Sequence, residues 1–224
     1  MAKSNTSAND YVALIYNATA VANIADNTAT APLVSLYIAA HTADPLAAGT
    51  QATSEAAFTG YARATVARAV AGFTCANGVV TLVADASFGA CTAGSSLVTH
   101  WSTGVAATGA TKVLHRGVFG SRQGAFTAIV TGNVVTIPGH TLAVNDSVAF
   151  YQPSGAVFPG GLTVGLVYFV KTVSVNDITV ALTSGGAAVA IAAPGDGLAF
   201  RVTPLAISAG ITQKLGAGAV IYEE

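Results

Sequence analysis

Apolar and polar residues alternate through residues 34–41, and this pattern predicts a β-strand. Positions 34, 36, 38 and 40 carry Val, Leu, Ile and Ala, which place one apolar face on a core. The positions between them carry Ser, Tyr, Ala and His, a mixed face that we expect to point outward. Asp44-Pro45 ends the strand, because proline lacks an amide donor and restricts the residue before it.

Further short strands are predicted along the first half of the chain. Residues 61–70 alternate again, and Asn77-Gly78 is typical of a two-residue hairpin turn into residues 79–83. Residues 95–103 and 111–118 form two more predicted strands, separated by a turn of small residues. In the first of these two, Leu97, Thr99 and the single tryptophan, Trp101, share a face.

One helix is predicted, over residues 8–24. Its apolar residues recur at helical spacing, and the face that we expect to be buried consists of Tyr11, Leu14, Ile15, Ala18 and Ala22. The residues that follow, from Asp26 to Pro32, are polar and end the helix.

The sequence pattern changes near Gly120, where short apolar runs separated by turn residues begin. Compact hairpin signals follow, with Gly132-Asn133 between two apolar runs and Gly185-Gly186 between residues 178–182 and 187–191. We interpret this part as a small all-β module of about six strands. The predicted fold is therefore mainly β: a jelly-roll-like antiparallel β-sandwich with one N-terminal helix, formed by residues 1–118 plus 203–224, and an inserted β domain at 119–202.

Charge is scarce, which narrows the classes of function. Only 8% of the 224 residues are charged and the net charge is −1, so no basic stripe exists to neutralise nucleic-acid phosphates. A long charge-free run, 147–170, contains prolines and glycines that argue against a membrane-spanning helix, and the start lacks an apolar leader. A surface this poor in charge is typical of a protein that packs into an assembly. The two cysteines, Cys75 and Cys91, are compatible with a disulfide, but without an export signal we expect free thiols.

Candidate catalytic and metal-binding residues are few. His41, Asp44 and Glu55 lie close in sequence at a strand-end turn, where turn and strand-end roles explain them more simply than acid–base chemistry or metal binding. His100 and His115 could lie on neighbouring strands, but no third ligand is evident. No nucleophile turn, phosphate-binding loop or metalloprotease helix motif occurs, so we expect no catalysis, cofactor or metal.

Two arginines are better candidates for interfaces. Arg63 shares parity with the polar side of its strand, so we expect it to face solvent or a partner. Arg68 shares parity with the apolar residues, and a buried guanidinium must be paired. Glu55 and Asp85 are its plausible internal partners; a contact to a neighbouring subunit is the alternative. The structural and interface candidates are Arg63, Arg68, His41, Asp44, Glu55 and Trp101.

Three segments resemble a family of tailed-bacteriophage virion proteins. They read SLYIAAHTADP, QATSEAAFTGYARATVAR and SLVTHWSTGVAATGATKVLHRG, and the end TPLAISAGITQKLGAGAVIYEE resembles that family's C-terminus. The resemblance covers roughly 1–118 and 203–224, and it departs from the usual pattern at Phe58 and Ala40, both still apolar. It implies a virion structural protein with a guest module of a kind common in phage proteins.

Three functions follow as expectations from the resemblance. The first is a capsid decoration, or cement, protein on the outer face of the head, made in the host bacterial cytoplasm. Its partners would be the major capsid protein and copies of itself, with neither nucleic acid nor membrane involved. The second is a tail, baseplate or fibre-associated component. The third is a receptor- or glycan-binding module that would use Tyr151, Phe158 and Tyr168 to stack on sugars.

Overall fold

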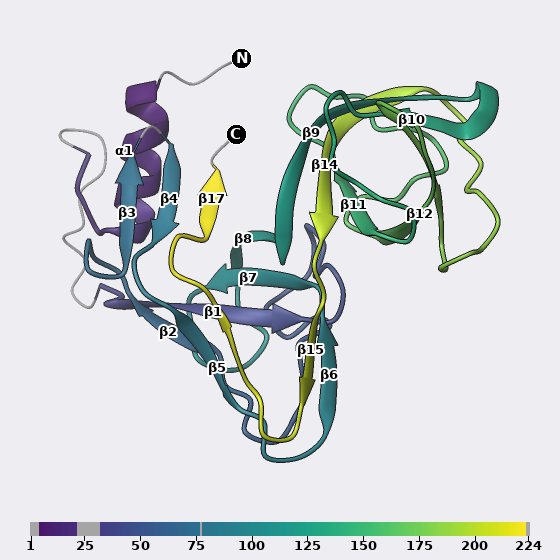
Figure 1. Ribbon diagram of the computed structural model, residues 1–224. Helices are drawn as coiled ribbons and strands as arrows, with labels where there is room; N and C mark the ends of the chain where they lie inside the picture. The colour runs from purple at the N-terminus through teal and green to yellow at the C-terminus, as the bar shows by residue number, and fades with distance from the viewer. Residues whose placement is uncertain (1–4, 22–31, 77, 223–224) are drawn as a thin grey trace.

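The computed structural model describes residues 5–21, 32–76 and 78–222, and it is mainly β, as predicted (Figure 1). Two β-rich parts lie next to each other. The first, which we call the scaffold, comprises the described residues up to 118 and from 203 onward; the second, the barrel, comprises residues 120–202. Every ladder between the named strands is antiparallel.

The scaffold contains one helix and four sheets. Its largest sheet has the order β2-β1-β7-β8, and three smaller sheets pair β3 and β4 with β17, β5 with β16, and β6 with β15. The elements are α1 (Asn5–Tyr16), β1 (Ser35–His41), β2 (Ala64–Ala67), β3 (Phe73–Ala76), β4 (Val79–Leu82), β5 (Ala86–Ala90), β6 (Ser95–Val98), β7 (His100–Gly104), β8 (Val113–Val118), β15 (Leu205–Ser208), β16 (Thr212–Leu215) and β17 (Val220–Tyr222).

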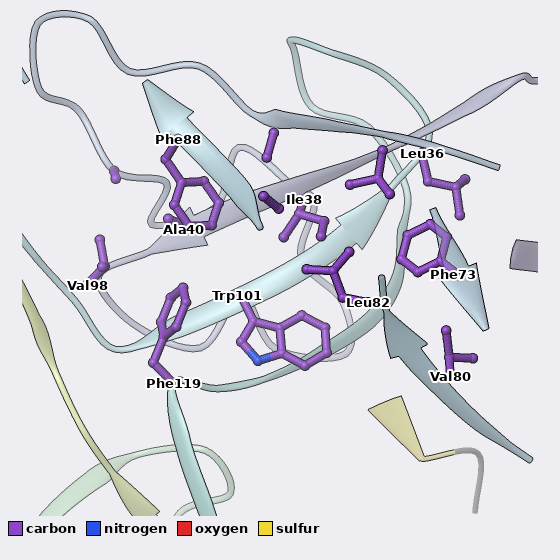
Figure 2. Close-up of a cluster of buried hydrophobic side chains, with 14 of the residues drawn as sticks. Leu36, Ile38, Ala40, Phe73, Val80, Leu82, Phe88, Val98, Trp101 and Phe119 are labelled. Atoms are coloured by element: carbon purple, nitrogen blue, oxygen red, sulfur yellow. The ribbon is translucent and has the colours of Figure 1, made fainter. Parts of the chain in front are cut away.

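Strand β1 lies in the middle of the scaffold. Leu36, Ile38 and Ala40 point into one core with residues such as Phe73 and Trp101, as predicted from the alternation (Figure 2). The other face of β1 differs from the prediction: Ala39 and His41 are fully buried. The cause is the long connection between β1 and β2, which folds back over this face.

The helix is shorter than predicted, and it buries a different face. It ends at Tyr16, where Asn17 and Thr19 both donate to the Ala13 carbonyl and Ala18 adopts a φ of 55°. Val12 and Tyr16 enter the core, whereas Tyr11 is 45% exposed. Of the predicted face, Ile15 does pack against the core, but the largest buried side chain of the helix, Tyr16, lies outside that face, and its hydroxyl reaches partners across the core. Ala22 lies outside the described residues.

Tyr16 and Arg68 together attach the helix to the sheets. The Tyr16 hydroxyl lies 3.1 Å from Thr103 Oγ1 and 2.6 Å from His115 Nδ1. Arg68 donates to the carbonyls of Leu14 and Ile15, which belong to the last turn of the helix and lack intrahelical partners.

The carboxylates predicted to pair with Arg68 bind other cations. Glu55 pairs with Arg63, and Asp85 pairs with Lys214. Parity along one strand could not reveal this arrangement, because Asp85 and Lys214 lie far apart in sequence and meet only through the pairing of β5 with β16.

Six strands close into the barrel, in the order β10-β13-β12-β11-β14-β9. They are β9 (Gly120–Ile129), β10 (Val134–Thr136), β11 (Ser147–Tyr151), β12 (Val167–Val173), β13 (Asp177–Ala181) and β14 (Gly195–Val202), with a short 3-10 turn η1 (Thr131–Asn133) between β9 and β10. The barrel has its own apolar core, built around side chains such as Phe126, Phe150 and Tyr168. The hairpin predicted over residues 178–191 is wrong in its second half. There Ala188 forms a single bridge to Ala181 and Val189 donates to the Val180 carbonyl, but no second strand follows, and Asn133 Oδ1 accepts the Ile191 amide.

The chain enters and leaves the barrel at neighbouring points. Gly120 at the start of β9 is paired with Val202 at the end of β14, and Thr203 donates to the Phe119 carbonyl at 2.7 Å. A small apolar cluster of Val118 with Ala149 and Val202 lies at this junction. Cys75 and Cys91 are free thiols, the alternative expected from the sequence.

The junction generates a prediction about the autonomy of the scaffold. Deleting residues 121–201 and joining Gly120 to Val202 through a short Gly/Ser link should leave a soluble protein with a cooperative melt. The two ends are already paired neighbours, and closing a short loop there costs little entropy. Circular dichroism of the deletion variant beside the full chain makes the measurement. Aggregation, or a melt without a transition, would mean that the two parts depend on one common core.

Candidate interaction site: the cleft between scaffold and barrel

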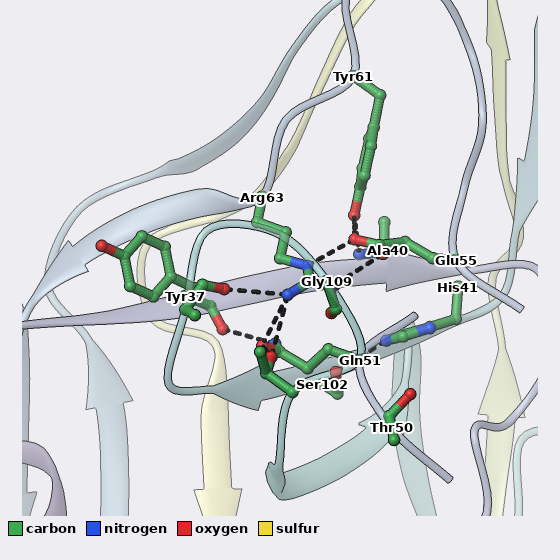
Figure 3. A network of polar contacts seen from close by, with 12 residues as sticks. Tyr37, Ala40, His41, Thr50, Gln51, Glu55, Tyr61, Arg63, Ser102 and Gly109 are labelled. Carbon is green, nitrogen blue, oxygen red and sulfur yellow. Dashed lines mark hydrogen bonds and ion pairs between the residues drawn. The ribbon is translucent and has the colours of Figure 1, made fainter. Parts of the chain in front are cut away.

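A buried ion pair closes the outer face of β1. Arg63 donates from Nε to Glu55 Oε1 at 2.7 Å and from Nη2 to Glu55 Oε2 at 2.8 Å (Figure 3). The same guanidinium donates to the carbonyls of Ala106 at 3.0 Å and Gly109 at 2.7 Å. Arg63 is only 5% exposed, so the expectation that it faces solvent or a partner is wrong. The 104–111 turn covers it, and that turn is distant in sequence.

Neighbouring polar side chains extend this network. Gln51 accepts from Thr111 at 2.9 Å and donates to the Tyr37 carbonyl at 3.0 Å, while Tyr61 donates to Glu55 at 2.9 Å (Figure 3). Burial raises the pKa of the Tyr61 hydroxyl, because the phenolate would lose its hydration. The network therefore uses its polar groups to hold the β1–β2 connection in place.

His41 belongs to the same layer and has a structural role. Its Nδ1 lies 2.9 Å from the Thr53 carbonyl and its Nε2 lies 2.8 Å from Ser102 Oγ. Because a carbonyl only accepts, Nδ1 carries the proton and Nε2 accepts from the serine. Burial lowers the pKa of His41, which favours this neutral ring. Both nitrogens are thus engaged in fastening the connection to β7.

Asp44 lies where the scaffold meets the barrel. Arg116 Nη1 on β8 donates to both oxygens of the carboxylate, at 2.8 and 2.7 Å, and the Leu46 amide donates to Oδ1 at 2.8 Å. The barrel loop before β12 approaches from the other side at Gly165. A Cβ at position 165 would lie 1.8 Å from Asp44 Oδ2, so glycine, here with φ of +73°, is required for the approach.

A cleft of about 500 Å³ opens beside this contact, between β8 and the outer wall of the barrel. Its walls carry two guanidinium groups, Arg116 and Arg122, and aromatic rings that include Tyr151 and Phe200. Trp101 forms part of the inner wall. Its indole lies over Gly117 and donates to the Val118 carbonyl at 3.1 Å. Trp101 is therefore a buried structural residue and not an exposed residue that could contact a partner.

Sequence reasoning did not identify Arg116 or Arg122 as site residues. No local signal distinguishes them: Arg116 lies in a predicted strand with Lys112, and Arg122 lies between two predicted strands. The carboxylate that orients Arg116 lies 72 positions earlier in the chain.

The three aromatic residues considered for sugar stacking have other contacts. Tyr168 is 1% exposed and its hydroxyl accepts from the Thr163 amide. Phe158 packs edge-on against Phe126 in the barrel core. Tyr151 packs edge-on against Phe200, and the Arg116 guanidinium lies over its ring at 6.0 Å.

The histidines considered for metal binding are also engaged. His100 is buried next to Thr99, with Nδ1 2.8 Å from the threonine hydroxyl, and His115 contacts Tyr16. Within the described ranges, no three side chains of the usual ligand types gather at one point. The one helix of those ranges is also too short to cross a bilayer.

The buried pair makes a first prediction for this region. Arg63→Met should lower the free energy of unfolding by about 3 kcal/mol, because it leaves the Glu55 charge without its partner in a desolvated site. Lys214→Ala, which breaks the exposed pair with Asp85, is the matched control and should leave the midpoint nearly unchanged. Urea denaturation of both variants compares them. Equal losses in the free energy of unfolding for the two variants would show that burial does not make the Arg63–Glu55 pair more important for stability than the exposed pair.

A second prediction concerns acid. Burial lowers the pKa of His100 to about 4, with the Asp44 carboxylate opposing the shift only in part. The unfolded chain then binds the proton near pH 6.5 and the folded protein does not. The contribution of neutral His100 to the free energy of unfolding is fully present above pH 6.5. The free energy of unfolding then falls by roughly 3 kcal/mol as the pH drops to 4.

Urea midpoints between pH 7.5 and 4.5 test this sign. His100→Gln should flatten the slope, whereas His140→Gln, a change in the barrel away from this cluster, should keep it. A His100→Gln protein with an unaltered slope would contradict the assignment.

Comparison with known proteins adds a family. The family model described as podophage GP4 fiber I protein gp80 matches residues 12–145, more than half of the chain. The match begins inside α1 and ends after β10, so it includes the cleft wall formed by β8 and the start of β9. Neither the curated proteins nor the solved structures give a match. The chain belongs to the family of the podophage GP4 fiber I protein gp80, and it is a structural protein of a phage virion.

Proposed function

We propose that this protein is a fibre-associated structural component of a phage tail. The observation that carries the proposal is the family match, whose name describes a fibre protein and whose extent includes the scaffold strands β1–β8. In this role the protein works by contact: it fills a place in an assembly and presents surfaces to its neighbours.

The composition of the surface supports an assembly role. Large apolar side chains such as Val34, Val70, Val157 and Val175 are between 67% and 86% exposed, on both the scaffold and the barrel. Neighbours can cover such side chains without removing water from charges, which is the costly step in burying a polar surface. Copies of this chain and other virion proteins are the proposed partners.

Capsid decoration is the second candidate. The segment SLYIAAHTADP and the one ending in GYARATVAR carry the resemblance that favours it. A surface of small, neutral residues would also suit close packing on a capsid lattice, where symmetry multiplies each contact. We propose no catalytic activity for either role, because the polar side chains of the β1 layer form hydrogen bonds and an ion pair that hold the β1–β2 connection in place.

Separation of heads from tails tests the proposal. Virions disrupted into the two fractions should yield this protein with the tail fraction, and antibody–gold particles on intact virions should mark fibres. The major capsid protein and a tail protein serve as fraction markers. Recovery with heads, with gold spread over the capsid, would contradict the fibre assignment and favour decoration.

A further inference from the structure

We propose that the cleft beside β8 binds an extended, acidic segment of a different virion protein, which adds to the sheet as a fifth strand. This inference rests on the protein being a virion component and holds for a fibre or a head position alike. Three features of the described residues support it: an open strand edge, the sign of the charge in the cleft, and the internal pairing of the chain's own acids.

The edge of β8 that faces away from β7 has no partner strand among the described residues. β8 ends the sheet order β2-β1-β7-β8, and the sheet's other end, β2, is packed against β5. The amides of His115 and Phe119 point toward β7, where they donate to Thr103 Oγ1 and the Thr99 carbonyl. Backbone groups alternate along an antiparallel strand, so those of Leu114 and Arg116 point away from β7. β8 is half-buried and its Val118 carbonyl already accepts from Trp101, but an edge without a partner strand is a template for strand addition.

The charge in the cleft selects an acidic occupant. Arg116 and Arg122 both line it, and no Asp or Glu is among the lining residues. Arg116 uses Nη1 for Asp44, which balances its charge and fixes the guanidinium in place, so the uncompensated positive charge of the cleft is that of Arg122. Arg122 is exposed. A carboxylate on the added strand would therefore meet oriented donors in a half-enclosed site.

A polypeptide fits the cleft better than a glycan. Sugars bind by stacking on open aromatic faces, but the ring of Tyr151 is covered by Arg116 and its edge packs on Phe200. An extended segment needs only the strand edge and apolar walls for alternate side chains. Six residues of β8 offer about 20 Å of edge.

A second copy of this chain is a poor source of that segment. Six of its acidic side chains already have partners within the chain. These are Asp44, Glu55, Asp85, Asp146, Asp177 and Asp196. Releasing one of them would leave a cation, a hydroxyl or a backbone amide without its acceptor, so among the described residues of a second copy these six are poor donors of the acid and another protein is the better source.

Cross-linking in purified virions tests the inference. The photoreactive residue p-benzoylphenylalanine replaces Gln152 on the rim of the cleft, or Asn176 on the distant β12–β13 turn as a control. Mass spectrometry should find Gln152→p-benzoylphenylalanine linked to an acidic, β-forming segment of another virion protein, and the control should not reach that segment. No cross-link at position 152, a link only to this chain, or a link to polysaccharide would overturn the proposal.

The captured segment, made as a synthetic peptide, then tests the mode of binding to the full chain. Arg122→Glu should weaken its affinity by at least about tenfold, while Lys112→Glu, an exposed cation next to the cleft but outside its lining, should change it little. N-methylation of alternate peptide residues should abolish binding in one register only. Equal loss in both charge variants, or tolerance of methylation in both registers, would overturn the added strand.

These outcomes separate the inference from the proposed function. Virions that contain the protein in tails but give no cross-link at position 152 overturn the strand addition and leave the fibre role intact. A cross-link in virions whose heads carry the protein does the reverse.

Discussion

One carboxylate lies where the two parts of this protein meet. Asp44 stands just after β1, accepts two hydrogen bonds from Arg116 on β8, and receives the backbone of the barrel at Gly165. It is 8% exposed, so its charge must be satisfied by these neighbours. Because the same contact orients Arg116, the shape and the charge of the cleft both depend on it.

The buried polar layer on the scaffold follows the same physical logic. Only 8% of the residues are charged, and several of these charged side chains are buried instead of lying on the surface. Arg63 and Glu55 form a pair that is 1% and 18% exposed at the side chains, and the 104–111 turn, distant in sequence, closes over it. Such a network favours one packing arrangement, because its hydrogen bonds are satisfied in that arrangement only, whereas small apolar side chains alone allow several.

Local patterns in the sequence predicted the strands and turns that depend on neighbouring residues alone. Alternation identified Leu36, Ile38 and Ala40 as the core face of β1, but it was wrong for Val34, which precedes the strand and is 78% exposed. The turn signals of the second half anticipated strands that the barrel contains. Sequence reasoning failed where partners are remote. Arg63 has the parity of an exposed residue and is buried by the 104–111 turn. Tyr16 lies outside the predicted helix face, and its hydroxyl contacts Thr103 on β7 and His115 on β8.

The candidate site shows the same division. Asp44, Glu55 and His41 were recognisable as polar residues at a strand end, but their roles depend on partners 8 to 72 positions away. Arg116, Arg122 and the open edge of β8 carry no local signature at all. They acquire meaning only when β8 becomes the last strand of its sheet and the barrel wall stands opposite it.

The central claim is that the close approach of the barrel loop at Gly165 to Asp44, which Arg116 holds in place, fixes the scaffold and the barrel relative to each other. Pulsed electron paramagnetic resonance between spin labels at Ser87 on β5 and Ser174 after β12, in a background with both native cysteines replaced, measures this directly. The account predicts one narrow distance distribution that broadens in the Asp44→Asn variant. A broad distribution in the parent protein, or a narrow one that Asp44→Asn leaves unchanged, would contradict it.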